Sequence, residues 1–576
     1  MRNKEIANIF YEIADFLEME GITFKPYAYQ KAALILENLE KDVFDIYKIG
    51  GKDALKKIPG IGTSIADKIE EYLITGKIKY YQDLKKKMPV KIQELTAVEG
   101  LGPRKIKILY QKLKIKNIKD LEKAAKSGKI APLFGFGKKT EKNILEGIKF
   151  LKRSKGRFLL GNILPEVKEI EKKFKSLKEV KKISVAGSVR RKKETIGDVD
   201  FLVVTKNAPK IMDFFVSLPG IIKIWGKGTT KSSIRMKQGF DVDLRAVPKK
   251  SYGSALQYFT GSKEHNIVTR KIAINLGLKL NEYGLFKGSK MIAGETEEEI
   301  YKILGMQWIP PELRENRGEI EAALENKLPE LIELKDIKGD LHCHSKWDGG
   351  KNSIEEMAKA AMARGYQYLG ISDHTKFLRI ERGLDERQLA WQRKEIEKLN
   401  LQVTTNNLQL RILHGCEANI LNDGSIDIKD EALKKLDYAI AGIHSNFKMP
   451  KKKMTERIIR AMKNPYIKIL AHPTGRIIKR RDEYQVDFDK ILRAAKEFNV
   501  ILEINSHPER LDLNDQNIKL VKEIGLKLII NTDSHHIDHL RYMEFGVAQA
   551  RRGWAEKKDI INSQSLNKIL KSLKIG

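Results

Sequence analysis

Ten of the eleven histidines of this 576-residue chain lie after residue 340, and this uneven distribution is the feature that most constrains the fold. Histidine is the commonest side chain among metal ligands. Most of these histidines, with several aspartates and a glutamate, follow short apolar runs that alternate with helical segments. Such side chains at strand ends in an alternating strand–helix pattern are typical of a barrel-like α/β domain. The sequence after Gly339 therefore predicts an α/β domain that binds metal ions.

The basic charge is concentrated in a different part of the chain. Residues 101–250 hold 39 basic and 14 acidic side chains, whereas residues 1–100 hold 16 of each. A local excess of this size predicts a surface that binds a polyanion such as nucleic acid. From the charge alone, a lysine-rich composition that only solvates surface helices stays open as the alternative.

The rest of the composition excludes several classes of protein. No apolar run reaches the roughly 18 residues of a membrane span, and the N-terminal residues mix charges with apolar side chains, unlike a secretory signal. Two cysteines, Cys343 and Cys416, cannot form a disulfide framework, and we expect them to be small packing residues in a reducing compartment. We expect a cytoplasmic, nucleoid-associated protein without membrane contact.

Three similar segments lie in the first 150 residues, which otherwise read as short amphipathic helices. Each has an apolar residue, a Gly-apolar-Gly turn and a helix start rich in basic residues, and they begin near Ile58, Val98 and Leu133. Glycines let backbone N–H groups approach an anion, and the following helix presents its positive end. A lone Gly-x-Gly usually marks only a tight turn, but three resemble helix-hairpin-helix elements, which grip the DNA backbone. The glycines that we expect to contact DNA are Gly60, Gly62, Gly100, Gly102, Gly135 and Gly137.

Two Asp-x-Asp pairs lie in apolar runs that predict strands, Asp198–Asp200 and Asp241–Asp243. Residues i and i+2 of a strand share a face, so each pair aims two carboxylates at one point. Carboxylates this close need a cation, and Mg²⁺ accepts a few carboxylates together with substrate phosphates. The preceding Gly187–Arg191 segment offers a hydroxyl and two cations for a triphosphate. The combination resembles the palm of a nucleotidyltransferase.

Together with Tyr258-Phe-Thr-Gly-Ser262 and Asn281-Glu-Tyr283, these motifs make residues 1–310 resemble a bacterial or archaeal family X DNA polymerase with a polymerase-beta-like core. The resemblance implies DNA-directed synthesis on gapped or nicked double-stranded DNA from deoxynucleoside triphosphates, as in short-gap filling during base excision repair. A primer 3′-hydroxyl would attack the α-phosphate in line, assisted by two Mg²⁺ or Mn²⁺ ions.

The same resemblance assigns individual residues of the palm and thumb. It implies Asp198, Asp200 and Asp243 as the ligands of the two ions and leaves Asp241 as a neighbour. The family often makes the Gly261–Ser262 peptide cis. The implied nucleotide-binding residues are Gly187, Ser188, Arg191, Gly197, Tyr258, Phe259, Gly261, Ser262, Asn266 and Arg270.

The N-terminal segment resembles the lyase domain of this family. This implies that Lys68 forms a Schiff base with a 5′-deoxyribose phosphate, with Lys25 and Tyr29 near the phosphate. The sequence departs at Ser64, where the best-known relatives have a phosphate-binding lysine. The alternative is that Lys68 is an ordinary lysine on a helix surface.

The motifs after Gly339 resemble the PHP (polymerase and histidinol phosphatase) domain. This implies a distorted TIM-like (β/α)7 barrel that hydrolyses phosphoesters with two or three Mn²⁺ or Zn²⁺ ions. The implied ligands are His342, His344, His374, Glu417, His444, His472, Asp533 and His535. Where the family usually has Ser-Asp-Gly, this chain reads Trp347-Asp348-Gly349, so the ligand position holds a glycine. We expect Asp348 to take over the coordination; the alternative is that Asp348 is a solvated loop residue and one metal is weakened. His507 is a candidate substrate contact.

These readings combine into one multidomain α+β and α/β architecture, which we expect to be monomeric. The expected parts are a helical lyase-like domain at 1–85 and a fingers-type DNA-binding domain at 86–150, both with helix-hairpin-helix elements, a palm at 151–248, a thumb at 249–315, a linker at 316–336 and the PHP domain at 337–576.

The leading hypothesis is a repair DNA polymerase whose PHP domain is a 3′→5′ exonuclease or 3′-end-processing enzyme. AP-endonuclease and 5′-deoxyribose-phosphate lyase are candidate further activities. The alternatives are a polymerase with a small-molecule phosphatase as its PHP domain, and a non-catalytic DNA-end scaffold.

Overall fold

The computed structural model describes residues 2–37, 39, 42–58, 60–96, 98, 101–153, 156–405 and 410–573. These residues belong to two compact units. The first is Met1–Lys155 with Lys479–Arg481, and the second is Gly156–Ile478 with Asp482–Gly576. Among the described residues, no helix is both long and apolar enough to cross a membrane.

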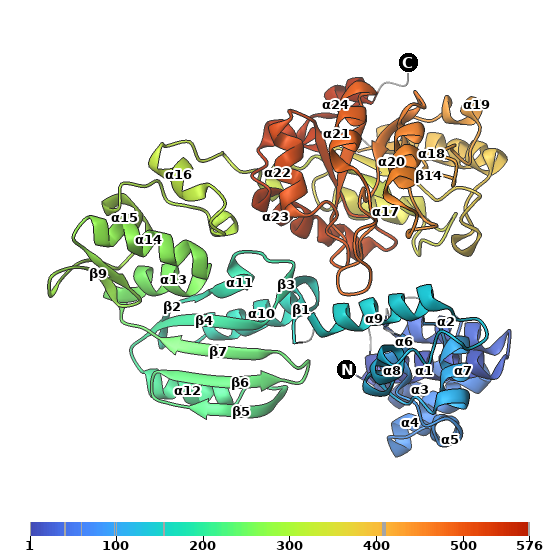
Figure 1. Ribbon diagram of the computed structural model, residues 1–576, viewed down its shortest axis with the longest axis horizontal. Helices are drawn as coiled ribbons and strands as arrows, with labels where there is room; N and C mark the ends of the chain where they lie inside the picture. The colour runs from blue at the N-terminus through green and yellow to red at the C-terminus, as the bar shows by residue number, and fades with distance from the viewer. Residues whose placement is uncertain are drawn as a thin grey trace. The chain divides into compact units, whose positions relative to one another are not determined.

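The first unit is built from helices, drawn blue to cyan in Figure 1. Apolar residues recur at helical spacing, so each helix buries one face, and Phe10, Leu17, Ile69 and Leu109 share one core. The helices are α1 (Arg2–Glu20), α2 (Lys25–Glu37), α3 (Val43–Lys56), α4 (Thr63–Thr75), α5 (Lys79–Lys87), α6 (Ile92–Thr96), α7 (Pro103–Leu113), α8 (Ile118–Lys126) and α9 (Lys138–Arg153).

Three turns in this unit share one geometry, before α4, α7 and α9. In each turn a backbone N–H between or beside the glycines donates to the carbonyl three residues earlier. These bonds are Ile61 to Ile58 (3.0 Å), Leu101 to Val98 (3.1 Å) and Phe136 to Leu133 (3.0 Å). Gly60 and Gly135 have φ of +87° and +79°, a conformation that favours glycine. Gly62 and Gly102 are the N-caps of α4 and α7, whereas Gly100 lies outside the described residues.

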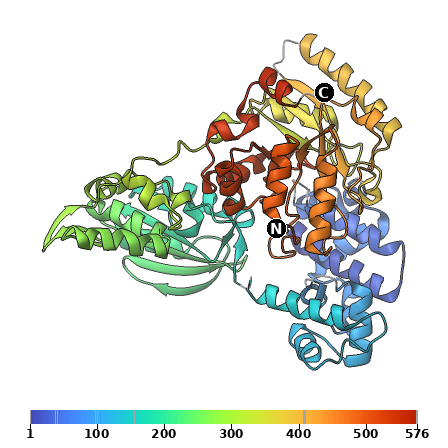
Figure 2. The same ribbon diagram turned by 45° about the horizontal axis from the view of Figure 1, so that its top comes forward.

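The second unit begins with a five-stranded sheet in the order β2-β4-β7-β6-β5, in which only β4 and β7 are parallel (Figures 1 and 2). The strands are β2 (Val180–Val185), β4 (Asp198–Thr205), β5 (Ile221–Lys227), β6 (Lys231–Met236) and β7 (Asp241–Ala246). Helices α10 (Leu160–Lys175) and α12 (Ala208–Val216) share its apolar core. A short ladder of β1 (Phe158–Leu159) with β3 (Thr195–Ile196) and the short α11 (Gly187–Arg190) complete this part. The apolar runs expected to be strands therefore are strands.

The thumb follows, with α13 packed against β4 and α15. Its elements are α13 (Tyr252–Thr260), α14 (Lys263–Asn275), β8 (Lys279–Asn281), β9 (Gly284–Lys287), β10 (Lys290–Ala293) and α15 (Glu297–Ile303). The linker expected at residues 316–336 contains one short helix, α16 (Glu319–Leu324). Ile320, Ala323 and Leu331 join the thumb core, and Glu319 is fully buried against His265 at 2.8 Å. This part of the linker is therefore packed on the thumb, while Ile332 joins the barrel core and Leu324 and Leu334 are exposed.

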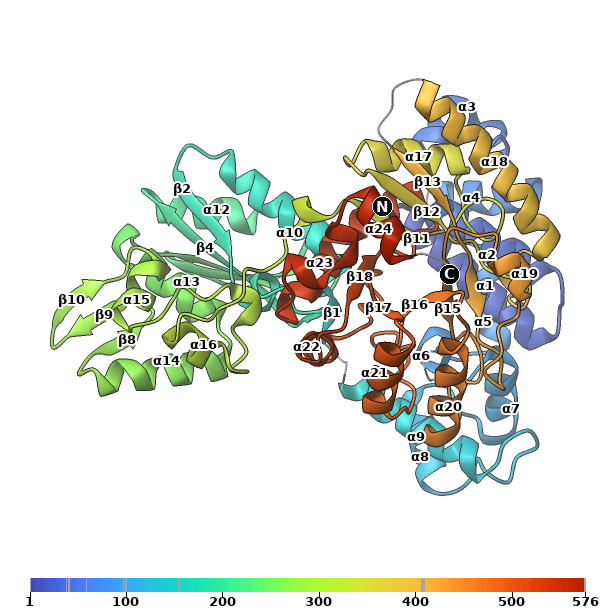
Figure 3. The ribbon, with the colours of Figure 1, turned by 90° about the horizontal axis from the view of Figure 1, so that it is seen from above.

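The last part is a barrel of parallel strands surrounded by helices, as Figure 3 shows. Its strands are β11 (Gly339–Cys343), β12 (Tyr368–Ile371), β13 (Arg411–His414), β14 (Glu417–Asn419), β15 (Ala439–Gly442), β16 (Ile467–Leu470), β17 (Ile501–Asn505) and β18 (Leu528–Asn531). With β13 and β14 counted as one interrupted strand, the barrel has the expected seven. A bridge between Cys343 and Ser534 brings the first strand to the segment after the last. Cys343 and Cys416 are buried and free.

The helices of this barrel alternate with its strands. They are α17 (Ile354–Met362), α18 (Glu386–Thr405), α19 (Asp430–Leu433), α20 (Lys451–Met462), α21 (Phe488–Glu497), α22 (Asp515–Glu523), α23 (Met543–Arg552) and α24 (Leu566–Ser572). Within the second unit the barrel also packs against the palm: Leu511 and Phe545 lie in the palm core. Arg476 Nη2 donates to Glu194 Oε2 at 2.7 Å across the same contact.

Candidate active sites

The palm carboxylates meet at the start of two parallel strands. Asp198 and Asp200 lie on β4, directly after Gly197, and the register places Asp200 opposite Asp243 of β7. Burial, and then the charges of Asp198 and Asp243, raise the pKa of Asp200 to about 7. Carboxylates that raise one another's pKa form a site that a divalent cation would stabilise.

Asp241 occupies a different environment from Asp243. Arg235 donates to both of its oxygens, at 2.8 and 2.9 Å, and Trp225 Nε1 donates to Oδ1 at 2.8 Å. By contrast, Asp243 has Lys231 Nζ at 3.1 Å on one oxygen. The carboxylate of Asp241 is therefore already neutralised by its own arginine.

The turn before α11 holds the backbone close to these carboxylates. Gly187 has φ of +59°, and a Cβ at this position would lie 2.7 Å from Asp200 Oδ2, so both conformation and space require glycine. Ser188 follows in the first turn of α11. Arg190 is engaged elsewhere, since its two Nη atoms donate to Glu297 at 2.7 Å each.

Arg191 points toward the thumb. Its Nε donates to Glu315 Oε1 at 3.0 Å, and its Nη1 donates to the Thr260 carbonyl. The Gly261–Ser262 peptide that follows is cis, as the resemblance implies. Arg191, which the resemblance implies to bind the triphosphate, thus makes a hydrogen bond to the Tyr258–Ser262 segment, which it implies to line the sugar.

The thumb residues implied to face the nucleotide form one small cluster. The rings of Tyr258 and Phe259 meet edge to face with centroids 5.0 Å apart, and the Arg270 guanidinium lies 5.1 Å from the Tyr258 ring. Asn266 is buried, and both ends of its amide are paired. The oxygen accepts from Gln257 at 2.9 Å, and the nitrogen donates to the Tyr258 carbonyl at 2.7 Å. Asn266 therefore positions Tyr258 in this structure.

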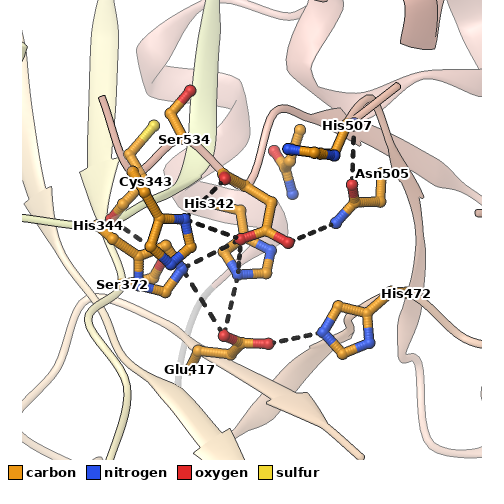
Figure 4. Close-up of polar contacts among 12 residues, drawn as sticks. His342, Cys343, His344, Ser372, Glu417, His472, Asn505, His507 and Ser534 are labelled. Carbon is orange, nitrogen blue, oxygen red and sulfur yellow. Dashed lines mark hydrogen bonds and ion pairs between the residues drawn. The ribbon is translucent and has the colours of Figure 1, made fainter. Parts of the chain in front are cut away.

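The second cluster lies at the C-terminal ends of the barrel strands, and Glu417 is at its centre. Its Oε1 lies 2.8 Å from His472 Nε2 and 3.1 Å from His444 Nε2. Its Oε2 lies 2.8 Å from His374 Nδ1 and 3.3 Å from His342 Nε2. Figure 4 shows His342 and His472 facing different oxygens of Glu417. His344 Nε2 lies 3.7 Å from Oε2, so five imidazoles face one carboxylate.

Asp533 is the second carboxylate of this cluster. Its Oδ1 lies 3.3 Å from His344 Nε2 and 3.8 Å from His342 Nε2. The His535 ring stacks on His344, with centroids 4.0 Å apart. The structure thus brings together all eight residues that the PHP resemblance implies. Sets with ligand atoms within 4.8 Å of one another are His344–His374–His535, His342–His344–Asp533, His374–Glu417–His444 and His344–Asp348–Asp373.

The donor atoms of the cluster fit divalent cations. His342 Nε2, His344 Nε2 and His374 Nδ1 are buried, face carboxylates, and make no hydrogen bond among the described residues. Buried polar atoms are nearly always paired, so nitrogens left in this way indicate a missing partner. Imidazole with carboxylate suits Mn²⁺, Zn²⁺ or Fe²⁺.

A surrounding set of polar side chains orients these imidazoles, and two of its members, Glu503 and Asn419, were not singled out from the sequence. His342 Nδ1 lies 2.8 Å from Glu503 Oε1, and His444 Nδ1 lies 2.7 Å from Asn419 Oδ1. Such a contact fixes which ring nitrogen faces the metal. Asp340 has a related role, because it accepts from Thr532 at the end of the neighbouring strand. Glu503 could have been found from the sequence, because it is a charged residue inside an apolar run that predicts a strand.

Asp348 belongs to this surrounding set. Its Oδ2 lies 2.7 Å from His344 Nδ1 and accepts from the His374 backbone N–H at 2.9 Å, and its Oδ1 accepts from Gly350 at 2.9 Å. It is fully buried, so the alternative of a solvated loop residue is wrong. A Cβ built at Gly349 would overlap the end of the Glu381 side chain, so any larger residue here would have to displace that carboxylate.

The rim of the cluster carries a cation and several rings. Arg510 Nε lies 3.6 Å from Asp533 Oδ2. The Tyr542 ring stacks on His539, with centroids 4.9 Å apart, and meets His507 edge to face at 5.3 Å. His507 therefore lies beside the cluster and outside the sets of ligands.

The candidate lyase site lies in the first unit. Lys68 Nζ donates to Ser64 Oγ and to the Ser64 carbonyl, both at 3.2 Å. It lies 5.3 Å from the Tyr80 ring and 5.9 Å from the Tyr29 ring. Burial, and less strongly the charge of Lys25, lower the pKa of Lys68. Ser64 thus replaces a second cation with a hydroxyl that holds Lys68.

Comparison with protein families matches four segments of the chain. They are a helix-hairpin-helix domain at residues 1–78, a SAM-like helix-hairpin-helix tandem at 92–149, a DNA polymerase beta thumb at 255–315 and a PHP domain at 340–507.

Individual relatives cover the chain to different extents. The chain is 37% identical over 579 residues to the DNA polymerase/3′-5′ exonuclease PolX of Bacillus subtilis, and the match covers 100% of both. A probable phosphatase of Acetivibrio thermocellus is 31% identical over 206 residues, which are 34% of this chain and 78% of that protein. A crystal structure of Leishmania infantum polymerase beta in a ternary complex covers 39% of this chain and 97% of its own, at 24% identity and a TM-score of 0.26, too low to support a structural argument.

Proposed function

The chain belongs to the PolX family of DNA polymerase/3′-5′ exonucleases, and from this membership we propose that it extends DNA 3′ ends at its palm and removes 3′ nucleotides at its PHP domain. The observation that carries the proposal is the coexistence of two cation-binding arrangements in one compact unit. One is the Asp198–Asp200–Asp243 group, and the other is the cluster around Glu417.

At the palm, we assign the chemistry to residues on β4, β7 and α11. Asp198, Asp200 and Asp243 would hold two Mg²⁺ or Mn²⁺ ions, which supply neutralising charge at the reacting phosphates. Gly187 brings the backbone of α11 to within reach of the same site, and Arg191 is the cation for the triphosphate. Tyr258 and Phe259 offer the flat surface beside the sugar.

At the PHP domain, the cluster around Glu417 would hold two or three Mn²⁺ or Zn²⁺ ions, which supply an activated water at neutral pH. Glu503, Asn419 and Asp348 orient the imidazoles from behind. Arg510, at the rim beside Asp533, is the cation placed to hold the phosphodiester.

The PHP domain has a second candidate function. The probable phosphatases that match this part of the chain favour hydrolysis of a small phosphate ester at the same cluster. The basic stretch at residues 101–250 and the three hairpin turns favour DNA as the substrate instead. Cleavage beside abasic sites is a related activity of the same chemistry.

The first unit supports a role in gap repair. Helices α4 and α7 begin at Gly62 and Gly102 without a side-chain cap, so their N-terminal N–H groups would bind DNA phosphates on gapped or nicked duplexes. Lys68, with a pKa lowered by burial, is suited to Schiff-base chemistry at a 5′-deoxyribose phosphate. A single chain would then trim, fill and clear the ends of one gap.

One assay separates these functions. A duplex with a one-nucleotide gap and a labelled primer is incubated with Mn²⁺ or Mg²⁺, with and without deoxynucleoside triphosphates, beside p-nitrophenyl phosphate. We expect lengthening with triphosphates, shortening without them, and slow turnover of the small ester. Rapid hydrolysis of the small ester with no shortening would assign the PHP domain as a phosphatase, and no lengthening would contradict the polymerase.

A further inference from the structure

A buried arginine of the PHP domain reaches into the polymerase part of the same unit. Arg552 ends α23, and its side chain is 3% exposed. Its Nη2 donates to Asp515 Oδ2 at 2.6 Å. Its Nη1 donates to the Arg191 carbonyl at 2.8 Å and to Glu315 Oε1 at 3.1 Å. One guanidinium thus holds both the main chain of Arg191 and the carboxylate that Arg191 contacts.

Glu315 is shared between cations of the two domains. Its Oε1 accepts from Arg191 Nε at 3.0 Å as well as from Arg552, and its Oε2 lies 3.5 Å from Lys193 Nζ. Although burial opposes ionisation, the charges of Arg552 and Arg191 hold the pKa of Glu315 below its usual range. Glu315 is 12% exposed, and a largely covered carboxylate with three cations is a fixed anchor and not a mobile surface pair.

This anchor leaves part of Arg191 available. Its Nε and Nη1 are engaged by Glu315 and the Thr260 carbonyl, while its Nη2 donates to no other residue in the described part of the chain. The free nitrogen belongs to a guanidinium whose direction is fixed at two points. A pre-oriented cation binds phosphate at a lower conformational cost than a mobile one.

The surrounding charges also favour an anion. Two carboxylates, Glu315 and Asp515, are shared by four cations: Arg191, Lys193, Arg317 and Arg552. Without Arg552, Glu315 would neutralise Arg191 more fully, and the Arg191 carbonyl would lose its donor. Both changes weaken an attraction for a triphosphate.

We propose that Arg552 of the PHP domain is a positioning residue for DNA synthesis, which holds Arg191 through Glu315 in the direction needed to bind the incoming triphosphate. The inference rests on the proposed polymerase function. It makes the PHP domain part of the nucleotide-binding machinery, in addition to its own hydrolytic site.

The test compares Arg552→Ala with Arg552→Lys and with Arg551→Ala in the full-length chain. Arg551 is the matched control, because it also crosses this contact, to Glu312 Oε1 at 2.8 Å, without touching Arg191. Loss of one charged hydrogen-bond partner should raise the triphosphate KM of Arg552→Ala about tenfold, with a smaller change in kcat. Arg552→Lys should lie between Arg552→Ala and wild type, and Arg551→Ala should match wild type.

Two further readouts separate positioning from a structural role. Digestion of a single-stranded 3′ end should be retained in Arg552→Ala, because the PHP cluster does not contact this residue. The second readout is the affinity of the enzyme–gapped DNA complex for the triphosphate. When Arg191→Ala is already present, adding Arg552→Ala should not lower this affinity further. An unchanged KM in Arg552→Ala, or an equal fall of synthesis and digestion in both Arg552 variants, would overturn the inference while leaving the polymerase assignment intact. Failure of the wild type to extend a primer would instead contradict the proposed function.

Discussion

The palm and the PHP domain gather metal-ligating side chains in contrasting ways. In the palm, three carboxylates come from two adjacent strands, and Asp198 is exposed. In the PHP domain, the eight candidate ligands lie at the ends of six strands, most of them are buried, and several imidazoles have an outer partner such as Glu503. The palm thus relies on strand register, whereas the barrel needs a surrounding polar shell. Substituting a palm carboxylate should therefore affect metal binding at the palm directly. Substituting a residue that surrounds the barrel cluster should affect metal binding by misorienting the imidazoles.

The largest effect is expected from the palm. Asp243→Ala should lower nucleotide addition by about a thousandfold or more, because positioned charge supplies most of the catalysis of phosphoryl transfer. Primer extension in single turnover measures the loss. Asp241→Asn is the control, since Asp241 is already paired with Arg235 and should lose far less. Near wild-type extension by Asp243→Ala would refute the palm assignment.

The corresponding change in the barrel should remove the other activity. His342→Ala or Asp533→Ala should abolish Mn²⁺-stimulated removal of 3′ nucleotides while extension persists, because each takes away a direct ligand and leaves charge uncompensated. Digestion of a labelled 3′ end is the measurement. His536→Ala, which changes a histidine that caps a short 3-10 helix and lies outside the sets of ligands, should keep activity. Equal digestion by His342→Ala and His536→Ala would place the hydrolytic site elsewhere.

The different construction of the two sites explains what the sequence could predict. The two carboxylates of an Asp-x-Asp pair on a strand point to the same face, so Asp198, Asp200 and Asp243 could be placed from spacing and resemblance. The candidate ligands of the barrel could be named because each follows an apolar run and matches the PHP resemblance. The roles of Glu503 and Asn419 depend on which imidazole lies beside them, and that follows only from the closed barrel.

Contacts between distant segments were the least predictable feature. The packing of Ile320 and Leu331 on the thumb could not be read from a mostly polar stretch. The bond from Arg552 to the Arg191 carbonyl joins residues 361 positions apart and leaves no local pattern.

The candidate lyase site around Lys68 needs no metal, so it provides a contrast with both metal sites. Borohydride should trap a covalent adduct between the wild type and a 5′-deoxyribose phosphate end, and Lys68→Ala should abolish it, whereas Lys77→Ala should not. The lowered pKa of Lys68 provides neutral amine at lower pH than an exposed lysine does, so trapping should rise with pH and level off early. A chelator should stop synthesis and digestion and leave trapping unchanged. Equal trapping by Lys68→Ala and wild type would point to another amine.

The smallest effect is expected from the polar side chains that surround the barrel cluster. Asp348→Asn should weaken Mn²⁺ binding by roughly 10–100-fold, because Asp348 orients His344 from behind. Isothermal titration of the apo protein measures this affinity without reference to activity. Gly349→Asp should not strengthen binding, since the new side chain must first displace the Glu381 carboxylate and adds a like charge beside it. A loss of bound metal as complete as that of His342→Ala would show that Asp348 is itself a ligand.

The most direct test of two independent sites on one chain uses two variants and one substrate. Asp243→Ala and Glu417→Gln are each incubated with the same labelled gapped duplex, Mn²⁺ and deoxynucleoside triphosphates, and the product lengths are compared with those of the wild type. The two-site account predicts only shortened primers from Asp243→Ala and only lengthened primers from Glu417→Gln. Loss of both lengthening and shortening in either variant would contradict it.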